Sequence, residues 1–361
     1  NVMNLYLKKE NCCGCGACAE CCPNKAIRMV QNREGFYYPQ ISKAKCTDCG
    51  MCKQVCPFKN HVKIACRNLY LGVQALDSDL RYSGSSGGIF AVLAQDILKK
   101  GGYVYGAGYD RNMKVVHRKI ITKAKLEQIR RTKYVQSDIH EVYHEIEKDL
   151  RNNKGVLFCG TPCQVQALKL FLHKEYEKLF LVDLVCYGVP SPGIWQDYVG
   201  YLEHKYGGKM TDFSFRDKRN ADNGHMRSFI IDEKEYIDSL YDDFFCKMYF
   251  RNWIIRPSCH SCIFCMPDRC SDFTIGDFWG LEHVEPDFAD GMGTSLVIAH
   301  TEKAIKMWNE IKHSTRWFEC KREDLIQPRL LEPTLLGKGR WKFMLYYRIL
   351  SFSVLVKLLS R

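Results

Sequence analysis

The chain has 361 residues, of which 46% are hydrophobic and 20 are cysteines, and its formal net charge is +12. This length suits two or three domains with real cores, and it excludes the small secreted scaffolds that depend on a disulfide framework. The first residues lack the apolar segment of a signal peptide, so we expect a cytoplasmic, reducing and anaerobic setting. The basic charge favours anionic partners, such as an acidic redox protein, a phosphate-bearing cofactor or an anionic membrane surface. The sequence contains no recognised nucleic-acid-binding motif, so no nucleic-acid partner is expected.

Two cysteine runs lie near the N-terminus, CCGCGACAECCP (12–23) and CTDCGMCKQVCP (46–57). Each has the spacing C-x2-C-x2-C-x3-C followed by proline, which is typical of bacterial ferredoxins with two [4Fe–4S] clusters. In that pattern the fourth cysteine of each run binds the cluster of the other run. Zinc sites more often show two separated C-x2-C pairs, so zinc and disulfides are the weaker alternatives. The expected ligand sets are Cys12, Cys15, Cys18 with Cys56, and Cys46, Cys49, Cys52 with Cys22; Cys13 and Cys21 are left as spare thiols.

After the ferredoxin-like part, which we expect to end near Cys66, strands and helices alternate. Ser85 or Ser86 can cap a helix that starts around Gly87–Gly88, and YVYGAGY (103–109) follows as a strand. Small residues before a helix let backbone N–H groups approach an anion, which favours a phosphate site. The alternative is a simple helix cap.

A second unit begins with a short apolar strand over Val156–Cys159. Thr161 suits an N-cap and Pro162 the first helical position, and Leu179–Val185 is the next strand, so the two strands are expected to be parallel. Cys163 falls in the first turn of the helix, and Cys186 follows the second strand. Both cysteines are therefore expected outside the carboxyl ends of parallel strands, where open α/β sheets bind ligands.

A third cysteine group, CHSCIFCMPDRC (259–270), has a different last spacing and no following proline. Two arrangements remain open. In the local arrangement Cys259, Cys262, Cys265 and Cys270 bind one cluster or a zinc ion. In the distributed arrangement Cys259 and Cys262 join Cys163 and Cys186 to hold a third [4Fe–4S] cluster.

The C-terminal segment WKFMLYYRILSFSVLVKLLSR (341–361) is apolar and basic by turns. The apolar run between Arg348 and Lys357 is short for a bilayer span. We expect a basic amphipathic helix over 336–361 that packs on the second domain or on another subunit. The alternative is peripheral contact with an anionic membrane surface.

Seven further segments follow one another along the chain: SSGGIF (85–90), TKYVQSD (132–138), FCGTPCQ (158–164), DLVCYGVPS (183–191), RPSCHSC (256–262), SDFTIGDFWG (271–280) and GTSLVIAHT (293–301). In this order they resemble the motifs of the coenzyme F420 hydrogenase/dehydrogenase β-subunit family, and the resemblance covers residues 80 to about 335. Members of this family bind FAD and [4Fe–4S] clusters, and pass electrons between an iron–sulfur chain and an organic hydride donor or acceptor. The resemblance therefore implies a flavin-binding α/β domain, and it leaves open whether coenzyme F420 takes part.

Carried over residue by residue, the resemblance implies two strips that contact the flavin: Ser85, Ser86, Gly87 and Gly88, and Lys133, Tyr134, Gln136 and Ser137. It also favours the distributed cluster, because Cys163, Cys186, Cys259 and Cys262 match the family's cysteine positions. Cys265 and Cys270 are not expected from the family and keep the local arrangement open. The sequence departs from the family at Tyr187, where relatives commonly have histidine. It departs again at 215–229, which lacks the usual aromatic residue soon after Arg–Asp–Lys. We name no catalytic residue.

We therefore predict an α+β protein with a ferredoxin-like two-cluster domain (1–66), an α/β FAD and iron–sulfur domain (67–335) and a C-terminal helix (336–361). The predicted function is an iron–sulfur flavoprotein oxidoreductase. It relays electrons from a low-potential, ferredoxin-like donor through [4Fe–4S] clusters to FAD and on to an organic hydride acceptor. The alternatives are a non-catalytic electron-transfer subunit that serves a partner enzyme, a true coenzyme F420 dehydrogenase or reductase, and a binding module whose cofactor pocket has decayed. The substrate, the direction of electron flow and the oligomeric state do not follow from the sequence.

Overall fold

The computed structural model describes residues 2–62, 68–219 and 226–359. The predicted domain boundary at Cys66 lies outside the described residues, as does the middle of the departing segment 215–229. The described residues form a mixed α+β fold in which helices and three sheets alternate along the chain, as predicted.

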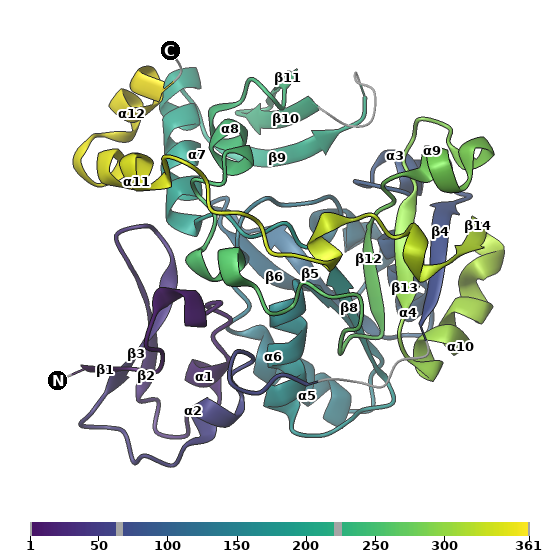
Figure 1. Cartoon of the computed structure of the whole chain (residues 1–361), viewed down its shortest axis with the longest axis horizontal. Coiled ribbons are helices and arrows are strands. Elements are labelled where there is room, and N and C mark those ends of the chain that lie inside the picture. The colour runs from purple at the N-terminus through teal and green to yellow at the C-terminus, as the bar shows by residue number, and fades with distance from the viewer. Residues whose placement is uncertain (1, 63–67, 220–225, 360–361) are drawn as a thin grey trace.

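The N-terminal part is a small sheet with two one-turn helices. Its strands have the order β1-β3-β2 and pair antiparallel: β1 (Val2–Asn4), β3 (Tyr37–Ser42) and β2 (Ile27–Gln31). The helices are α1 (Ala17–Glu20) and α2 (Met51–Gln54), one in each cysteine run. In Figure 1 this part is purple and lies beside α5 and α6 of the larger domain.

The centre of the larger domain is an eight-stranded mixed sheet. Its strands, in spatial order, are β14 (Thr315–Cys320), β4 (Leu69–Ala75), β13 (Ser295–Ala299), β12 (Phe273–Asp277), β8 (Leu179–Leu184), β7 (Val156–Gly160), β5 (Tyr103–Tyr109) and β6 (Val115–Ile120). Strands β5, β7, β8 and β12 run parallel, and the outer strands pair antiparallel. The predicted parallel pair and the helix between them, α6 (Pro162–Leu172), are confirmed.

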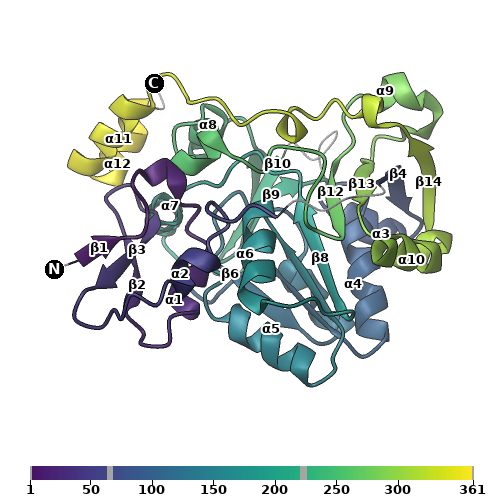
Figure 2. The ribbon, with the colours of Figure 1, turned by 60° about the horizontal axis from the view of Figure 1, so that its bottom comes forward.

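Helices cover both faces of this sheet. On one face α4 (Ile89–Lys99) and α10 (Glu302–Ile311) bury Leu93 and Trp308 against strand residues such as Leu157. On the other face α5 (Val142–Arg151) and α6 share a core with the N-terminal part, in which Val165 packs with Ala17. Figure 2 shows α5 and α6 between the sheet and the purple N-terminal part. Apolar burial thus joins the ferredoxin-like part firmly to the larger domain.

One local prediction is wrong. The residue that caps α4 is Gly88, with φ at 87°, and neither serine before it donates or accepts a capping bond. Ser85 and Ser86 instead bond to segments far away in the sequence, because the loop is held between other strands.

A third sheet and the C-terminal helices complete the fold. The sheet has the order β11-β10-β9, and the elements around it are α7 (Pro192–Tyr206), β9 (Met210–Asp217), β10 (Met226–Ile231), β11 (Lys234–Ser239), α8 (Phe244–Phe250), α11 (Arg340–Ile349) and α12 (Phe352–Leu359). The C-terminal segment forms two helices rather than one, since the chain is extended at Leu350. Phe343 and Leu355 are buried in the core that includes Tyr198 of α7. Short helices α3 (Ser78–Tyr82) and α9 (Leu281–Val284) lie at the sheet edge. Among the described helices, none has the length and apolar character needed to cross a membrane.

Candidate redox site

The two N-terminal cysteine runs fold in the same way. In each, a glycine with a positive φ precedes a one-turn helix that carries the third cysteine of the run; these are Gly16 and Gly50, both at 78°. Residues with a Cβ rarely adopt this backbone conformation, so the glycines allow the sharp turn. The sequence repeat is therefore also a structural repeat.

The fourth cysteine of each run lies with the first three of the other run. Burial, followed by the charges of Cys15 and Cys12, raises the pKa of the Cys56 thiol to about 11. Burial is the largest cause of the raised pKa of Cys52, and Cys22 contributes to it. A pocket of about 250 Å³ contains the first group. The structure thus brings together the two sets that the spacing predicts: Cys12, Cys15, Cys18 and Cys56, and Cys46, Cys49, Cys52 and Cys22.

A further cysteine group lies at the carboxyl ends of β7 and β8. Cys163 is in the first turn of α6, Cys186 follows β8, and Cys259 and Cys262 belong to the short 3-10 turn Pro257–Ser261 and the residue after it. All four line one pocket of about 30 Å³, the inner pocket. Burial, followed by the charges of Cys163 and Cys262, raises the pKa of Cys186 to about 12. The distributed set therefore converges from three separate segments.

The local set does not converge in this way. Cys265 lines the inner pocket and donates a hydrogen bond to Cys262, which lowers the pKa of the Cys262 thiol to about 7. Cys270 is buried in the core that α6 shares with the sheet, near Asp183, and is not part of the pocket wall. Cys265 is thus the one additional candidate from the 259–270 run.

In the described part of the chain, no three His, Cys, Asp or Glu side chains lie close enough to share one metal ion. This finding applies to single ions such as zinc, whose ligand atoms must lie close together around one metal. A [4Fe–4S] cubane spaces its thiolates more widely, because four iron atoms lie between them.

Cys13, which sequence reasoning set aside as a spare thiol, lies between the two pockets. It lines both of them and is 7% exposed. Hydrogen bonding of its thiol with the thiols of Cys15 and Cys163 raises its pKa well above the usual value. Cys13 and Phe58 therefore both lie between the first group and the inner pocket, a contact that no spacing rule in the sequence could have indicated.

The predicted serine–glycine loop is fixed by strands β4 and β13. Ser85 Oγ accepts the backbone N–H of Thr132 (2.7 Å), and Ser86 Oγ donates to the carbonyl of Thr294 (3.0 Å). The Gly87 N–H donates to Ser295 Oγ (3.0 Å), and a Cβ at Gly87 would lie 2.2 Å from the Val73 carbonyl oxygen. Gly87 is therefore required by close backbone approach.

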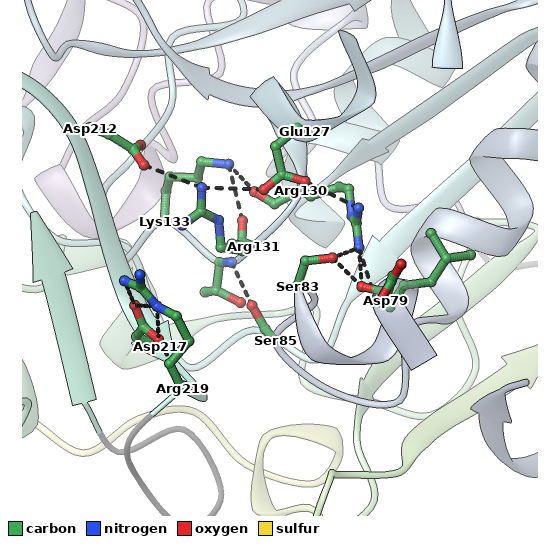
Figure 3. Close-up of polar contacts among 12 residues, drawn as sticks. Asp79, Ser83, Ser85, Glu127, Arg130, Arg131, Lys133, Asp212, Asp217 and Arg219 are labelled. Atoms are coloured by element: carbon green, nitrogen blue, oxygen red, sulfur yellow. Dashed lines mark hydrogen bonds and ion pairs between the residues drawn. The ribbon is translucent and has the colours of Figure 1, made fainter. Parts of the chain in front are cut away.

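The second predicted strip begins with Lys133, beside this loop. Its ammonium donates to the backbone carbonyls of Arg130 and Arg131, as Figure 3 shows. Burial, followed by the charge of Arg131, lowers the pKa of Lys133 to about 7. Neighbouring Arg131 is paired with Glu127 and with Asp212 (both 3.3 Å), whereas Lys133 has no carboxylate partner among the residues that the structure describes.

Further along, the same strip reaches the cysteine side of the molecule. Tyr134 packs against Phe215 and Tyr249. Gln136 donates to the Cys13 carbonyl (2.7 Å) and lines the inner pocket, while Ser137 bonds His117 and Gln164. Residues 132–137 therefore connect the serine–glycine loop to the inner pocket. The predicted flavin residues are thus divided along this connection. Ser85 and Lys133 lie at its loop end, and Gln136 and Ser137 lie at its inner-pocket end.

A second lysine adds positive charge beside the loop. Lys218 donates to the carbonyls of Arg81, Ser86 and Met292 at 2.8–3.0 Å, and burial lowers its pKa to about 8. Sequence reasoning missed Lys218, although it belongs to the Arg–Asp–Lys signal of the departing segment. With Lys133, it gives the loop a cationic environment that suits an anionic ligand.

Comparisons with known proteins agree with the cysteine geometry. Residues 153–323 match the family model for the C terminus of the coenzyme F420 hydrogenase/dehydrogenase β subunit, and residues 11–60 match the 4Fe-4S dicluster domain. Among solved structures, a chain of the F420-reducing [NiFe] hydrogenase complex from Methanosarcina barkeri, studied as a xenon derivative, is similar over 80% of this chain and 91% of that chain. The sequence identity is 16% and the TM-score is 0.46. No curated protein matches the chain.

The two family models cover the three cysteine groups and five of the seven motifs, in the expected order, whereas the motifs at 85–90 and 132–138 lie outside both matched ranges. The chain is therefore an iron–sulfur electron-transfer protein. It carries a 4Fe-4S dicluster domain over 11–60, and residues 153–323 are related to the C terminus of the coenzyme F420 hydrogenase/dehydrogenase β subunit.

Proposed function

We propose that the protein is an iron–sulfur flavoprotein oxidoreductase that relays electrons from a low-potential, ferredoxin-like donor to FAD and on to an organic hydride acceptor. The observation that carries the proposal is one continuous path of contacts. The first cysteine pocket touches the inner pocket through Cys13, and Gln136 and residues 132–135 lead from there to the serine–glycine loop. A relay needs such a path, because single electrons must pass between centres inside the protein.

In this proposal twelve cysteines hold three [4Fe–4S] clusters. The dicluster domain, over 1–66, supplies Cys12, Cys15, Cys18 and Cys56 to one cluster and Cys46, Cys49, Cys52 and Cys22 to the other. The larger domain, over 67–335, supplies Cys163, Cys186, Cys259 and Cys262. Their convergence on one pocket supports this choice over the local run, because Cys270 is buried elsewhere.

The proposed FAD site is formed by Ser85–Gly88 and by Lys133. Gly87 lets the loop pack closely on β4 and β13, and Lys133 and Lys218 place positive charge beside it. Ammonium groups of this kind would stabilise the phosphates or a reduced, anionic flavin ring. When bound, FAD would convert the one-electron steps of the clusters into the two-electron transfer that an organic acceptor needs.

The test is anaerobic reconstitution, followed by measurement of iron, sulfide and released flavin per chain. We expect about twelve irons and one FAD. About eight irons without flavin would overturn both the third cluster and the flavin site, and would leave only the dicluster domain as a redox centre.

A second candidate, an electron-transfer subunit that serves a partner enzyme, is favoured by one feature of the surface. Helices α11 and α12 expose Trp341 (67%), Ile349 (67%) and Leu358 (49%) while their other faces are buried. Exposed apolar groups in this density favour a protein partner. Flavin that is reduced by the clusters, together with no turnover of small acceptors by the isolated chain, would support this candidate. Reduction of added coenzyme F420, followed by its absorbance, would instead support the deazaflavin version of the enzyme.

A further inference from the structure

Arg256 is the most deeply buried charged side chain among the described residues. It is 0% exposed and lies at the contact between the dicluster domain and the larger domain. Its backbone N–H donates to the Val189 carbonyl, and its own carbonyl accepts the N–H of Cys259, so the inner-pocket loop fixes its position. Its side chain lines the inner pocket and extends from there into the dicluster domain.

The guanidinium contacts the first cysteine group directly. Nε donates to the Cys12 carbonyl (2.8 Å) and Nη2 to the Tyr37 carbonyl (2.9 Å), and Nη2 lies 3.8 Å from Cys12 Sγ. Nη1 donates to Gln136 Oε1 (2.9 Å). Gly14, with φ at 68°, makes room for it, since a Cβ there would lie 2.6 Å from Nη1.

These partners are neutral carbonyls, an amide and a thiol, so the positive charge has no carboxylate partner among the described residues. The nearby Glu34 is already paired with Arg340 (2.9 Å) and Arg348 (3.0 Å). The rings of Tyr38 and Phe36 lie 4.3 and 5.3 Å from the guanidinium, but ring faces offset only part of the cost of a charge in a protein interior. Four thiolates around an iron–sulfur cluster supply negative charge at this place, and reduction adds one more unit.

The other cysteine group of the dicluster domain has a different environment. Cys49 is exposed, and the nearest lysines in the chain, Lys45 and Lys53, are exposed too. Water and salt screen charges at such positions. A buried guanidinium therefore distinguishes the first cluster site from the second, although the two loops have the same sequence spacing.

We propose that Arg256 is the counter-charge of the Cys12–Cys15–Cys18–Cys56 cluster and raises the reduction potential of this cluster but not that of the second dicluster site, so that an electron is stabilised at the cluster next to the inner pocket. Burial alone would oppose reduction, because the reduced cluster carries the larger charge. Arg256 offsets that cost from a fixed distance. The inference deepens the proposed relay and rests on the ligand set proposed for this cluster, but it requires neither the third cluster nor FAD.

The experiment is an EPR-monitored redox titration of the reconstituted full chain, after its iron and sulfide have been measured. Cys56→Ser assigns the signal, because it changes one ligand of this cluster. Arg256→Gln removes the positive charge, Arg256→Lys keeps it, and Gln136→Glu neutralises it in place with an intact arginine. Arg151→Gln, at an exposed site that is paired with Glu147, is the control for net charge.

We expect Arg256→Gln and Gln136→Glu to lower the equilibrium constant for reduction of this cluster at least tenfold, which is about 59 mV for a one-electron couple. Arg256→Lys and Arg151→Gln should change this equilibrium constant by less than tenfold. The reduction potential of the second cluster should stay the same in every variant. If Arg256→Gln fails to assemble, Gln136→Glu decides the result alone. Unchanged potentials in the charge-removing variants, or equal shifts of both clusters, would overturn the inference. Fewer than about eight irons in the unmodified chain would instead contradict the proposed function itself.

Discussion

The first cysteine pocket and the inner pocket offer the same ligand type but are built differently. The first takes its cysteines from two short loops with identical spacing and has a volume of about 250 Å³. The inner pocket takes Cys163, Cys186, Cys259 and Cys262 from three segments that the sheet brings together, and its volume is about 30 Å³. Local spacing specifies the first site, whereas the order of strands specifies the second.

The inner pocket also contains more thiols than one cluster requires. Cys13 and Cys265 line it together with the four proposed ligands. Since a thiol must lose its proton to bind iron, hydrogen bonds among these thiols influence which of them become ligands. The bond from Cys265 lowers the pKa of Cys262 to about 7, which favours Cys262 as the ligand and Cys265 as its donor.

The largest effect that would separate the two sites is the loss of a whole cluster. Cys186→Ala should remove about four irons per chain and leave about eight, because only the inner set is broken. Cys270→Ala is the matched control, since Cys270 is equally a cysteine of the larger domain but lies outside the pocket. Iron and sulfide analysis after identical reconstitution measures both. The reverse result, with iron lost only from Cys270→Ala, would restore the local arrangement.

The same contrast explains how much could be predicted from the sequence. The crossed pairing of Cys56 and Cys22 was predictable, because one repeat with one following proline leaves few arrangements. The parallel pair β7 and β8 followed from a strand–helix–strand pattern, and it placed Cys163 and Cys186 at one sheet edge.

Long-range contacts were not predictable in this way. Arg256 bonds Cys12, which lies 244 residues away in the sequence, and Cys13 bonds Cys163 across the same domain contact. No local pattern encodes contacts of this kind. The serine cap of α4 was predicted wrongly for the same reason. Ser86 bonds a carbonyl 208 residues away rather than the helix that follows it.

The next largest effect concerns the serine–glycine loop. In Gly87→Ala the new methyl group would meet the Val73 carbonyl oxygen at 2.2 Å and the Ser295 nitrogen at 2.6 Å. These backbone atoms are held in the sheet and cannot move aside without breaking its hydrogen bonds. We therefore expect the free energy of unfolding to fall by about 2–3 kcal/mol. Thermal unfolding followed by circular dichroism measures the loss, and released flavin per chain should fall with it while iron stays constant.

Gly200→Ala is the control for that substitution. Gly200 lies within α7, where nothing lies within 4 Å of an added Cβ, so alanine should stabilise the helix by up to about 1 kcal/mol. An equal loss of stability in both variants would show that the close contact at Gly87 is not what the loop depends on.

A smaller, pH-dependent effect is expected at Lys133, whose pKa is lowered to about 7. Below that value the ammonium is charged and attracts an anionic flavin. As the pH rises through about 7 the charge is lost, so FAD affinity should fall between pH 6 and pH 8.5. Bound FAD itself favours the charged form and moves the transition upward. Fluorescence titration with FAD at both pH values should show that the affinity for FAD falls about tenfold from pH 6 to pH 8.5. A tenfold loss corresponds to a pKa of Lys133 that bound FAD raises by about one unit.

In Lys133→Met the decline should disappear and affinity should be low at both pH values. Lys125→Met, at an exposed position of the same basic segment, should keep the wild-type pH dependence. If Lys133→Met retains the full decline, another group carries the effect, and Lys218 becomes the next candidate.

The smallest effect, and the one that joins the two pockets, is expected at Cys13. Cys13→Ala leaves every proposed ligand in place, so iron content should not change. It removes the thiol that contacts both Cys15 and Cys163 and leaves a gap on the short path between the pockets. Electron tunnelling falls with the distance crossed through space, so reduction of the inner centre after rapid mixing with a low-potential donor should slow several-fold. Cys21→Ala, a spare buried thiol of the same run on the other cluster's side, should leave that rate unchanged. Equal rates in both variants and the wild type would mean that electrons cross between the pockets by another route, and that the two sites are coupled by the fold rather than by this side chain.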